Sequence, residues 1–310
     1  MMPLPLFTRP LMHLPLKNGT LWLCLLLLLL TQHAAYGALE ARDAEDRLVT
    51  LERPATRVIA LAPHIVENLF SIDAQDTLVG AVHYSDYPDA AGLIPRVGGI
   101  GSMSLERIVA LEPDLIVLWG SGTPIGLRSS IERLGLSYFV DEIRSLADLG
   151  DSFEALGVLT GHQSEGARVS AQLHSSLNTL DSVQARRRSG NIPGVFFQLW
   201  DQPLQSIGKD HLLSEVIERC GGRSITNNIA GLAPLVSLER VLSDNPALII
   251  VENQQQARHW DSYPELKAMR TANVAVINPD LLHRPTLRLL QGMQIICKGI
   301  DAISQAANAN

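Results

Sequence analysis

The sequence predicts an α/β protein built from two similar lobes, each with a mostly parallel sheet, and joined by one long helix. Short, continuous apolar runs alternate with helix-like segments along the chain, as is typical of strands that are covered on both faces. One helix-to-strand unit occurs twice, at 104–117 and at 237–250. Between the two copies, the stretch from Leu146 to Arg188 contains no proline. These three observations favour two lobes and a stiff connection between them.

The first 37 residues have the pattern of a signal peptide. The apolar run from Leu21 to Leu30 follows Arg9 and Lys17 and is short for a membrane span, and small residues near Gly37 suggest cleavage after residue 37 or 38. A lipoprotein is disfavoured because the cysteine of this segment lies inside the apolar run. An uncleaved N-terminal anchor stays open as an alternative. We therefore expect a mature chain from residue 38 in the periplasm.

Charge and cysteine content fit an exported protein. The whole chain has 25 basic and 32 acidic residues; residues 1–37 hold two basic and no acidic ones, so the mature chain has 23 against 32, a net charge of −9. This acidity argues against nucleic-acid binding. Cys220 and Cys297 remain in the mature chain, and an even pair in an oxidising compartment is most simply a disulfide. Two buried free thiols are the alternative.

The strands and the connecting helix follow from the apolar pattern. Seven runs have strand length: 57–61, 77–82, 114–119, 137–140, 194–200, 247–251 and 274–277. Between the fourth and the fifth run, Leu173, Leu177 and Leu180 are at helical spacing. We therefore expect an N-terminal lobe over 38–160, a linking backbone helix over 161–190 and a C-terminal lobe over 191–310.

The repeated unit begins with the same four residues, Ser-Leu-Glu-Arg, in both copies. Ser104 and Ser237 are helix N-caps by pattern, and Glu106 and Glu239 lie where the helix dipole favours a negative charge. If the lobes are related by an approximate two-fold axis, the two glutamates occupy matching corners. Either they contact a partner there, or they only complement the helix dipoles.

Aromatic residues are scarce in this chain, yet Tyr84, Trp119 and Trp200 all fall at the ends of apolar runs. Ligands of open α/β sheets bind outside the carboxyl ends of the strands. These rings therefore predict a cleft for a flat or bulky ligand. Arg284 either anchors an anionic group of that ligand or pairs with a nearby acid such as Asp280.

Signatures of enzymes are missing from the sequence. It has no Gly-x-Ser-x-Gly elbow, no phosphate-binding loop and no His-Glu-x-x-His motif. The histidines near strand ends have no spacing that selects a metal site: His64, His83, His211 and His283. We expect no catalysis, no bound metal and no resident cofactor.

The order of several segments resembles the bilobal periplasmic substrate-binding proteins of ABC importers for cobalamin, siderophores and haem, and within that family the cobalamin-binding members. The matching segments cover essentially the whole mature chain: Arg57 to Pro63, Tyr84 to Pro88, Leu105 to Leu115, about Ser164 to Arg188, and Leu238 to Leu248. The resemblance implies two Rossmann-like lobes on a helical backbone. It also implies a monomeric receptor that delivers a corrinoid to a permease dimer.

Individual roles are also implied by this resemblance. Tyr84 and Trp119 match positions that contact the corrinoid, and Arg284 matches an arginine of the cleft. The two cysteines at 220 and 297 match a disulfide pair, and Glu106 and Glu239 match glutamates that dock onto arginines of the permease.

Two positions depart from the family pattern. Ile100 and Ala233 stand where the cobalamin-binding members have aromatic residues, while Trp200 has no counterpart there and offers some stacking surface in return. A haem or ferric-siderophore receptor of the same fold is therefore the main alternative, and a metal-ion-binding protein is the weakest one.

Overall fold

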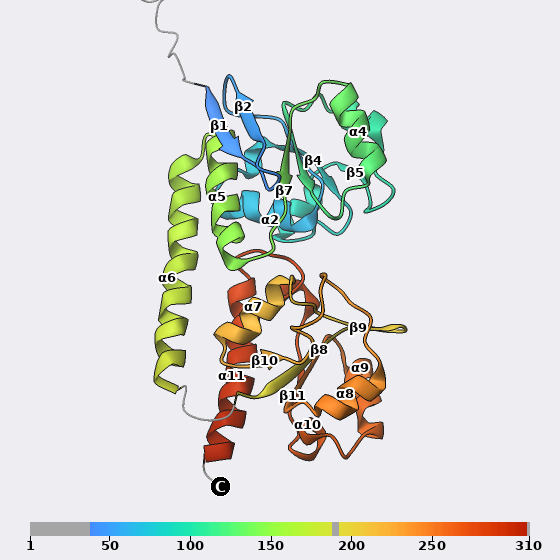
Figure 1. Cartoon of the computed structure of the whole chain (residues 1–310). Coiled ribbons are helices and arrows are strands. Elements are labelled where there is room, and N and C mark those ends of the chain that lie inside the picture. Colours follow the sequence, from blue (N-terminus) through green and yellow to red (C-terminus); the bar gives the residue numbers. More distant parts are fainter. Residues whose placement is uncertain (1–37, 188–191, 309–310) are drawn as a thin grey trace, which may run out of the picture. The chain divides into compact units, whose positions relative to one another are not determined.

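A computed structural model describes residues 38–187 and 192–308 (Figure 1). The expected signal segment, 1–37, lies outside the described residues. The described chain contains two five-stranded sheets, and all seven strands expected from the sequence are present. The predicted α/β class with two mostly parallel sheets and a long helix is confirmed. No helix within 38–187 or 192–308 is long and apolar enough to cross a membrane.

The first sheet is parallel throughout, in the order β5-β4-β3-β6-β7. Its strands are β3 (Val58–Ala60), β4 (Leu78–Val82), β5 (Arg96–Gly98), β6 (Leu115–Trp119) and β7 (Tyr138–Asp141). The helical segments between them are α2 (Pro63–Ser71), η1 (Gln75–Thr77), η2 (Asp89–Leu93), α3 (Leu105–Ala110) and α4 (Ile125–Arg133). An antiparallel hairpin that the apolar runs did not reveal, β1 (Leu39–Arg42) with β2 (Leu48–Leu51), precedes this sheet.

The second sheet has the order β10-β8-β11-β12, with β9 paired antiparallel to β8. Its strands are β8 (Gly194–Asp201), β9 (Leu204–Ser206), β10 (Arg223–Ser224), β11 (Leu248–Val251) and β12 (Val274–Val276). Its helical segments are α7 (Leu212–Arg219), α8 (Leu238–Asp244), α9 (Gln254–His259), η3 (Trp260–Ser262), α10 (Lys267–Arg270), η4 (Pro279–Leu281) and α11 (Leu289–Asn308). Apart from the β8–β9 hairpin, its strand pairs are parallel, as continuous apolar runs predict.

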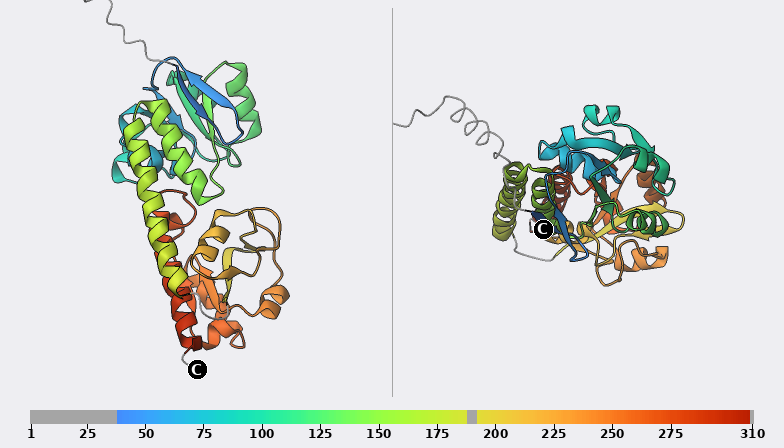
Figure 2. Two further views of the ribbon diagram at one scale, coloured as in Figure 1. Left: turned by 60° about the vertical axis from the view of Figure 1, so that its left-hand side comes forward. Right: turned by 90° about the horizontal axis from the view of Figure 1, so that it is seen from above.

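Two long helices follow the first sheet. The helix α5 (Leu146–Thr160) begins with a capping box between Ser145 and Asp148 and ends at Gly161, whose φ of 78° suits glycine. The next helix, α6 (Gln163–Arg187), packs against α5 and lies within the stretch expected to connect the lobes. Figure 2 shows α6 continuing from α5 toward α11, and Gln184 of α6 donates a hydrogen bond to Asp301 of α11.

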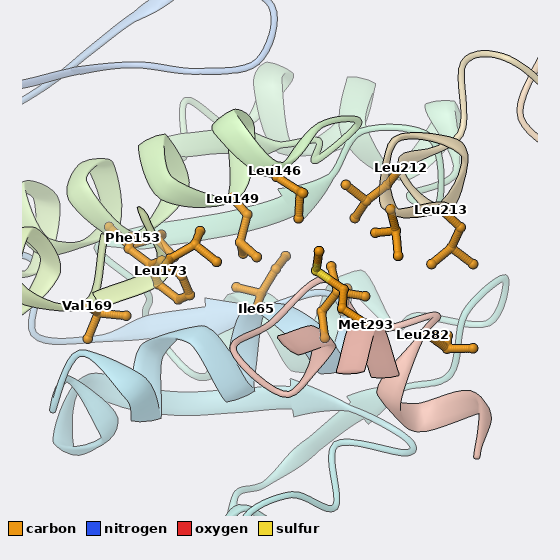
Figure 3. Packing of buried hydrophobic residues seen from close by; sticks show 14 of the residues in the cluster. Ile65, Leu146, Leu149, Phe153, Val169, Leu173, Leu212, Leu213, Leu282 and Met293 are labelled. Atoms are coloured by element: carbon orange, nitrogen blue, oxygen red, sulfur yellow. The ribbon is translucent and has the colours of Figure 1, made fainter. Parts of the chain in front are cut away.

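One apolar core cluster includes residues of both sheets and of the helices α2, α5, α6, α7 and α11. Figure 3 shows part of this cluster, with Ile65, Phe153 and Leu173 on one side and Leu212, Leu213 and Met293 on the other. The apolar rows of α5 and α6 are therefore buried against the sheets, which is where most of the stability of such helices originates.

Candidate functional site

The three aromatic residues predicted for the ligand site lie at the carboxyl ends of strands. Tyr84 follows β4 with a φ of 65° and is 77% exposed, and Trp200 in the β8–β9 hairpin is 61% exposed. Trp119 ends β6 and is half-buried. A positive φ is uncommon for tyrosine and is found mostly where the surroundings hold the backbone in place. Exposed aromatic rings at strand ends of both sheets are what a ligand with large apolar faces requires.

Trp119 is held by its own loop and by a buried histidine. A Cβ atom at Gly122 would lie 1.8 Å from Cε3 of Trp119, so only glycine lets the ring lie against this turn. The ring of His64 meets Trp119 edge-to-face, with centroids 5.8 Å apart. The orientation of Trp119 is therefore fixed by packing before any ligand arrives.

The histidine beneath Trp119 faces a buried carboxyl. His64 Nε2 lies 3.8 Å from Oδ2 of Asp141, the last residue of β7, and neither atom has a hydrogen-bond partner within the described chain. Burial lowers the pKa of His64 to about 3, and the positive charge of Arg284 lowers it further. Burial raises the pKa of Asp141 to about 7, and the nearby carboxylates of Glu142 and Asp148 act in the same direction. Both side chains are therefore predominantly neutral at mildly acidic pH.

Arg284 lies between the two sheets and is surrounded by carboxylates. Its guanidinium pairs with Glu67 of α2 at 2.9 Å, with Asp86 in the loop after β4 at 2.7 Å, and with Asp280 at 3.1 Å. The hydrogen bond from Arg284 holds the pKa of Asp86 below its usual range. The sequence left two interpretations open for Arg284, and its pairing with Asp280 is confirmed. A contact between Arg284 and a ligand remains a prediction.

A second arginine reinforces the same junction. Arg288 Nη1 lies 3.4 Å from Glu67 Oε1, and its guanidinium stacks 4.0 Å above the ring of Tyr87. Thr286 Oγ1 donates to Glu67 Oε2 at 3.3 Å, and Asn68 Nδ2 donates to a backbone carbonyl of the same segment at 3.2 Å. Glu67, which is 3% exposed, is thus the carboxylate on which the segment 284–288 converges.

Sequence reasoning missed Glu67 as the centre of this network. It lies in a helix that is otherwise largely apolar, between Val66 and Asn68, with Leu69 and Phe70 following. A carboxylate on the buried face of an apolar helix rarely lacks a partner. That was the available signal, although it does not name the partner.

The two Ser-Leu-Glu-Arg copies are capped helix starts, as predicted. The Oγ atoms of Ser104 and Ser237 each accept a hydrogen bond from the backbone three residues later, at 3.2 Å in both copies. Glu106 and Glu239 are exposed, and hydrogen bonds from the backbone and then from the serine hydroxyl lower the pKa of each carboxyl. Both glutamates are therefore ionised at the start of their helices.

The predicted disulfide is confirmed. Cys220 at the end of α7 is bonded to Cys297 in α11. The bond ties together two helices that both contribute to the shared core cluster.

The histidines do not assemble into a metal centre in the part of the chain that the structure describes. Across 38–187 and 192–308, no group of three histidine, cysteine or acidic side chains is arranged to hold a metal ion. His211 accepts a hydrogen bond from the backbone of Leu213 at the start of α7, and His283 pairs with Glu252 at 2.7 Å.

Comparison with known proteins places this architecture. The family model described as periplasmic binding protein matches residues 58–281. The chain is 30% identical to a vitamin B12-binding protein of Vibrio vulnificus, over 81% of this chain and 92% of that protein. It is also similar to the crystal structure of the periplasmic vitamin B12 binding protein of Vibrio cholerae, with a TM-score of 0.74 and 30% identity, over 81% of this chain and 98% of the other.

A periplasmic haem-binding protein of Roseiflexus shares the fold, with a TM-score of 0.71 and 18% identity, over 81% of this chain and 99% of the other. At this level of identity the likeness concerns the fold alone. The family match covers both sheets and α6, and the identity to curated relatives extends over about four fifths of the chain. By this match, the chain belongs to the periplasmic binding protein family.

Proposed function

We propose that this protein is the periplasmic receptor of an ABC importer and that its ligand is cobalamin or a related corrinoid. Proteins of this family bind small ligands and work with ABC transporters, and the family is not one of enzymes. The observation that carries the choice of ligand is the identity of about 30% to vitamin B12-binding proteins over most of both chains. In this function the corrinoid is cargo, the protein catalyses no reaction, and it needs no resident cofactor.

The geometry of the strand ends supports a corrinoid. Tyr84 and Trp200 offer exposed rings, and Trp119 offers a ring of fixed orientation, so the three cover the apolar faces of a large macrocycle. Arg284, with Asp86 beside it, meets the polar periphery of the ligand. Ile100 and Leu235, which are also exposed, supply aliphatic contacts where relatives supply aromatic ones.

A haem or a ferric siderophore is the second candidate ligand. Ile100 and Ala233 leave less aromatic surface than the family pattern has, and exposed Tyr84 and its neighbour His83 carry atoms that coordinate iron. A metal-ion receptor has less support, because no cluster of ligating side chains exists within the described residues.

Delivery to the importer requires a docking surface and export. We assign docking to Glu106 and Glu239, one on each lobe, which would meet arginines of a permease dimer. The segment 1–37 would act as a cleaved signal peptide, and the receptor would act as a monomer.

The deciding experiment is a titration of residues 38–310 with cyanocobalamin, haemin and a ferric siderophore, followed by calorimetry and by tryptophan fluorescence. We expect saturable one-to-one binding of cyanocobalamin, weakened roughly tenfold or more by Trp119→Ala because a stacked ring is lost. Tyr263→Ala, an aromatic deletion far from these strand ends in sequence and attached to the η3 region, is the matched control and should leave affinity unchanged. Saturation by haemin or the siderophore without any cobalamin signal would retain the receptor and overturn the ligand.

A further inference from the structure

A pocket of about 590 Å³ lies at the carboxyl ends of β6 and β7, and none of the proposed corrinoid contacts lines it. Its walls are the turn between β1 and β2, the residues after the two strand ends, and the first turns of α5. Phe139, Val140 and Ala155 contribute apolar surface. The carboxyl groups at its wall are Asp43, Glu45, Asp141, Glu142, Asp148 and Asp151.

Four of these carboxylates are held in place by the protein itself. Asp43 pairs with Arg47 at 2.9 Å and Glu45 pairs with Arg128. Glu142 accepts from the backbone and hydroxyl of Ser121, at 2.6 and 3.1 Å, and Asp148 closes the capping box of α5. The arginines that line the pocket are also engaged, Arg42 with Asp46 at 3.3 Å and Arg144 with Glu142 at 3.5 Å. The wall is therefore preformed, and its charges are fixed.

The remaining polar groups are unsatisfied. Oδ2 of Asp141 and Oγ of Ser152 have no hydrogen-bond partner within the described chain, although the two residues are only 3% and 4% exposed. Asp151, at the exposed rim, also has no ion pair or hydrogen bond among the described side chains. A buried polar group without a partner costs free energy that a bound ligand can recover.

We propose that this pocket binds a small organic cation, an ammonium group on a compact apolar body, with Asp141 as the anchor. The carboxylates of the wall repel anions and favour a positive charge, and a buried carboxylate forms its strongest hydrogen bonds with a cationic donor. Ser152 offers a second acceptor, Asp151 attracts the cation at the rim, and the apolar wall receives the body of the ligand. A metal ion is disfavoured because the described carboxylates do not converge in threes.

This second site lies next to the proposed corrinoid site without depending on it. Asp141 faces His64 at 3.8 Å, and His64 in turn packs against Trp119. The emission of Trp119 is therefore expected to report the arrival of a cation, whereas cyanocobalamin binding is measured in a separate titration. A failure of either proposal leaves the other standing.

The test is calorimetry of residues 38–310 with benzylamine, and with benzyl alcohol as the neutral isostere, at a pH about one unit above the pKa of Asp141 so that the carboxylate is ionised. We expect saturable binding of one benzylamine and at least about tenfold weaker binding of benzyl alcohol, because the charge-assisted hydrogen bond is lost. Asp141→Asn should weaken benzylamine by about the same factor. Asp89→Asn, an exposed substitution on η2 outside the pocket, is the control and should have no effect.

A second variant tests the pocket without touching its charges. Ala155→Leu places extra volume at the wall and should abolish benzylamine binding while the thermal unfolding of the protein shows that it is folded. Equal affinity for benzylamine and benzyl alcohol would overturn the proposal. So would unchanged benzylamine binding in a folded Asp141→Asn or Ala155→Leu variant.

Discussion

Arg284 and Glu67 are 217 positions apart in the sequence, and Arg284 Nη1 lies 2.9 Å from Glu67 Oε1. The arginine follows the last strand of the second sheet, and the glutamate lies on the first helix after β3. Because Arg288 and Thr286 contact the same carboxylate, the segment 284–288 fastens the second sheet to the helix α2. This fastening is an ion-pair network, and it is separate from the connection through α6.

Removing the shared carboxylate should destabilise the protein. Glu67→Gln leaves Arg284 and Arg288 without their buried partner, and breaking a buried pair costs about 3 kcal/mol. Urea unfolding of the variant and the parent measures the change. Asp73→Asn removes an exposed pair with Arg168 at 3.7 Å and should cost well under about 1 kcal/mol. Equal losses in the two variants would contradict the central role of Glu67.

His64 and Asp141 should make opposing contributions to the pH dependence of stability. The pKa of His64 falls from its ordinary 6.5 to about 3, so stability from this group is lost as pH falls from about 6.5 toward 3. The pKa of Asp141 rises from its ordinary 3.8 to about 7, so the unfolded chain releases this proton first, and stability is lost as pH rises from about 4 to 7. Between about pH 4 and 6.5 the two slopes cancel.

Single substitutions should uncover each slope. Relative to the parent, Asp141→Asn should lose about 1.4 kcal/mol per unit of acidification between pH 6.5 and about 4, because only His64 then titrates. His64→Gln should show the opposite trend over the same window. Urea unfolding at several pH values measures both differences, and other groups drop out because the parent is the reference. Variant curves parallel to the parent would refute the opposition.

The disulfide should contribute several kcal/mol. Cys220 and Cys297 are 77 positions apart, and closing a loop of that length restricts the unfolded chain by about 4 kcal/mol. The double variant Cys220→Ser/Cys297→Ser should lose about that much in urea unfolding. A reducing agent should destabilise the parent similarly and leave the double variant unchanged. An effect of the reductant on the serine variant would point to another cause.

Docking should depend on the two capped glutamates. If the proposed roles hold, Glu106→Lys/Glu239→Lys abolishes transport of the ligand in cells, because the contacts with permease arginines become repulsive. Cyanocobalamin affinity of the purified variant should stay the same. Glu154→Lys/Glu218→Lys makes an equal change of charge on exposed positions of α5 and α7 and should still support transport. Loss of ligand affinity in the first variant would contradict the assignment.

Local sequence patterns predicted the parts of this structure that local chemistry determines. Continuous apolar runs identified seven strands because burial on both faces requires them. The strands that were missed are short or carry charged residues, such as β5 (Arg96–Gly98) and β1 (Leu39–Arg42), so their apolar signal is weak. The N-caps Ser104 and Ser237 were found because a cap needs only a few neighbouring residues.

The chemistry of the site depended on long-range partners and was predicted less well. The aromatic residues were identified from their places at strand ends, whereas the junction around Glu67 joins segments more than two hundred residues apart. Asp141 directly follows an apolar run, where a carboxylate is usually exposed, and yet the β1–β2 turn and α5 bury it. A single sequence contains no local signal for either arrangement.

The helix α6 and the segment 284–288 attach the same two sheets to each other at two separate places. One attachment would leave a free swivel, whereas two attachments define a line and leave rotation about that line as the easy degree of freedom. Motion of this kind changes the separation of Tyr84 and Trp200 only by stretching the ion pairs of Arg284. The electrostatic energy of that junction therefore acts as a restoring spring, so the aromatic surfaces return to one spacing after each ligand has left.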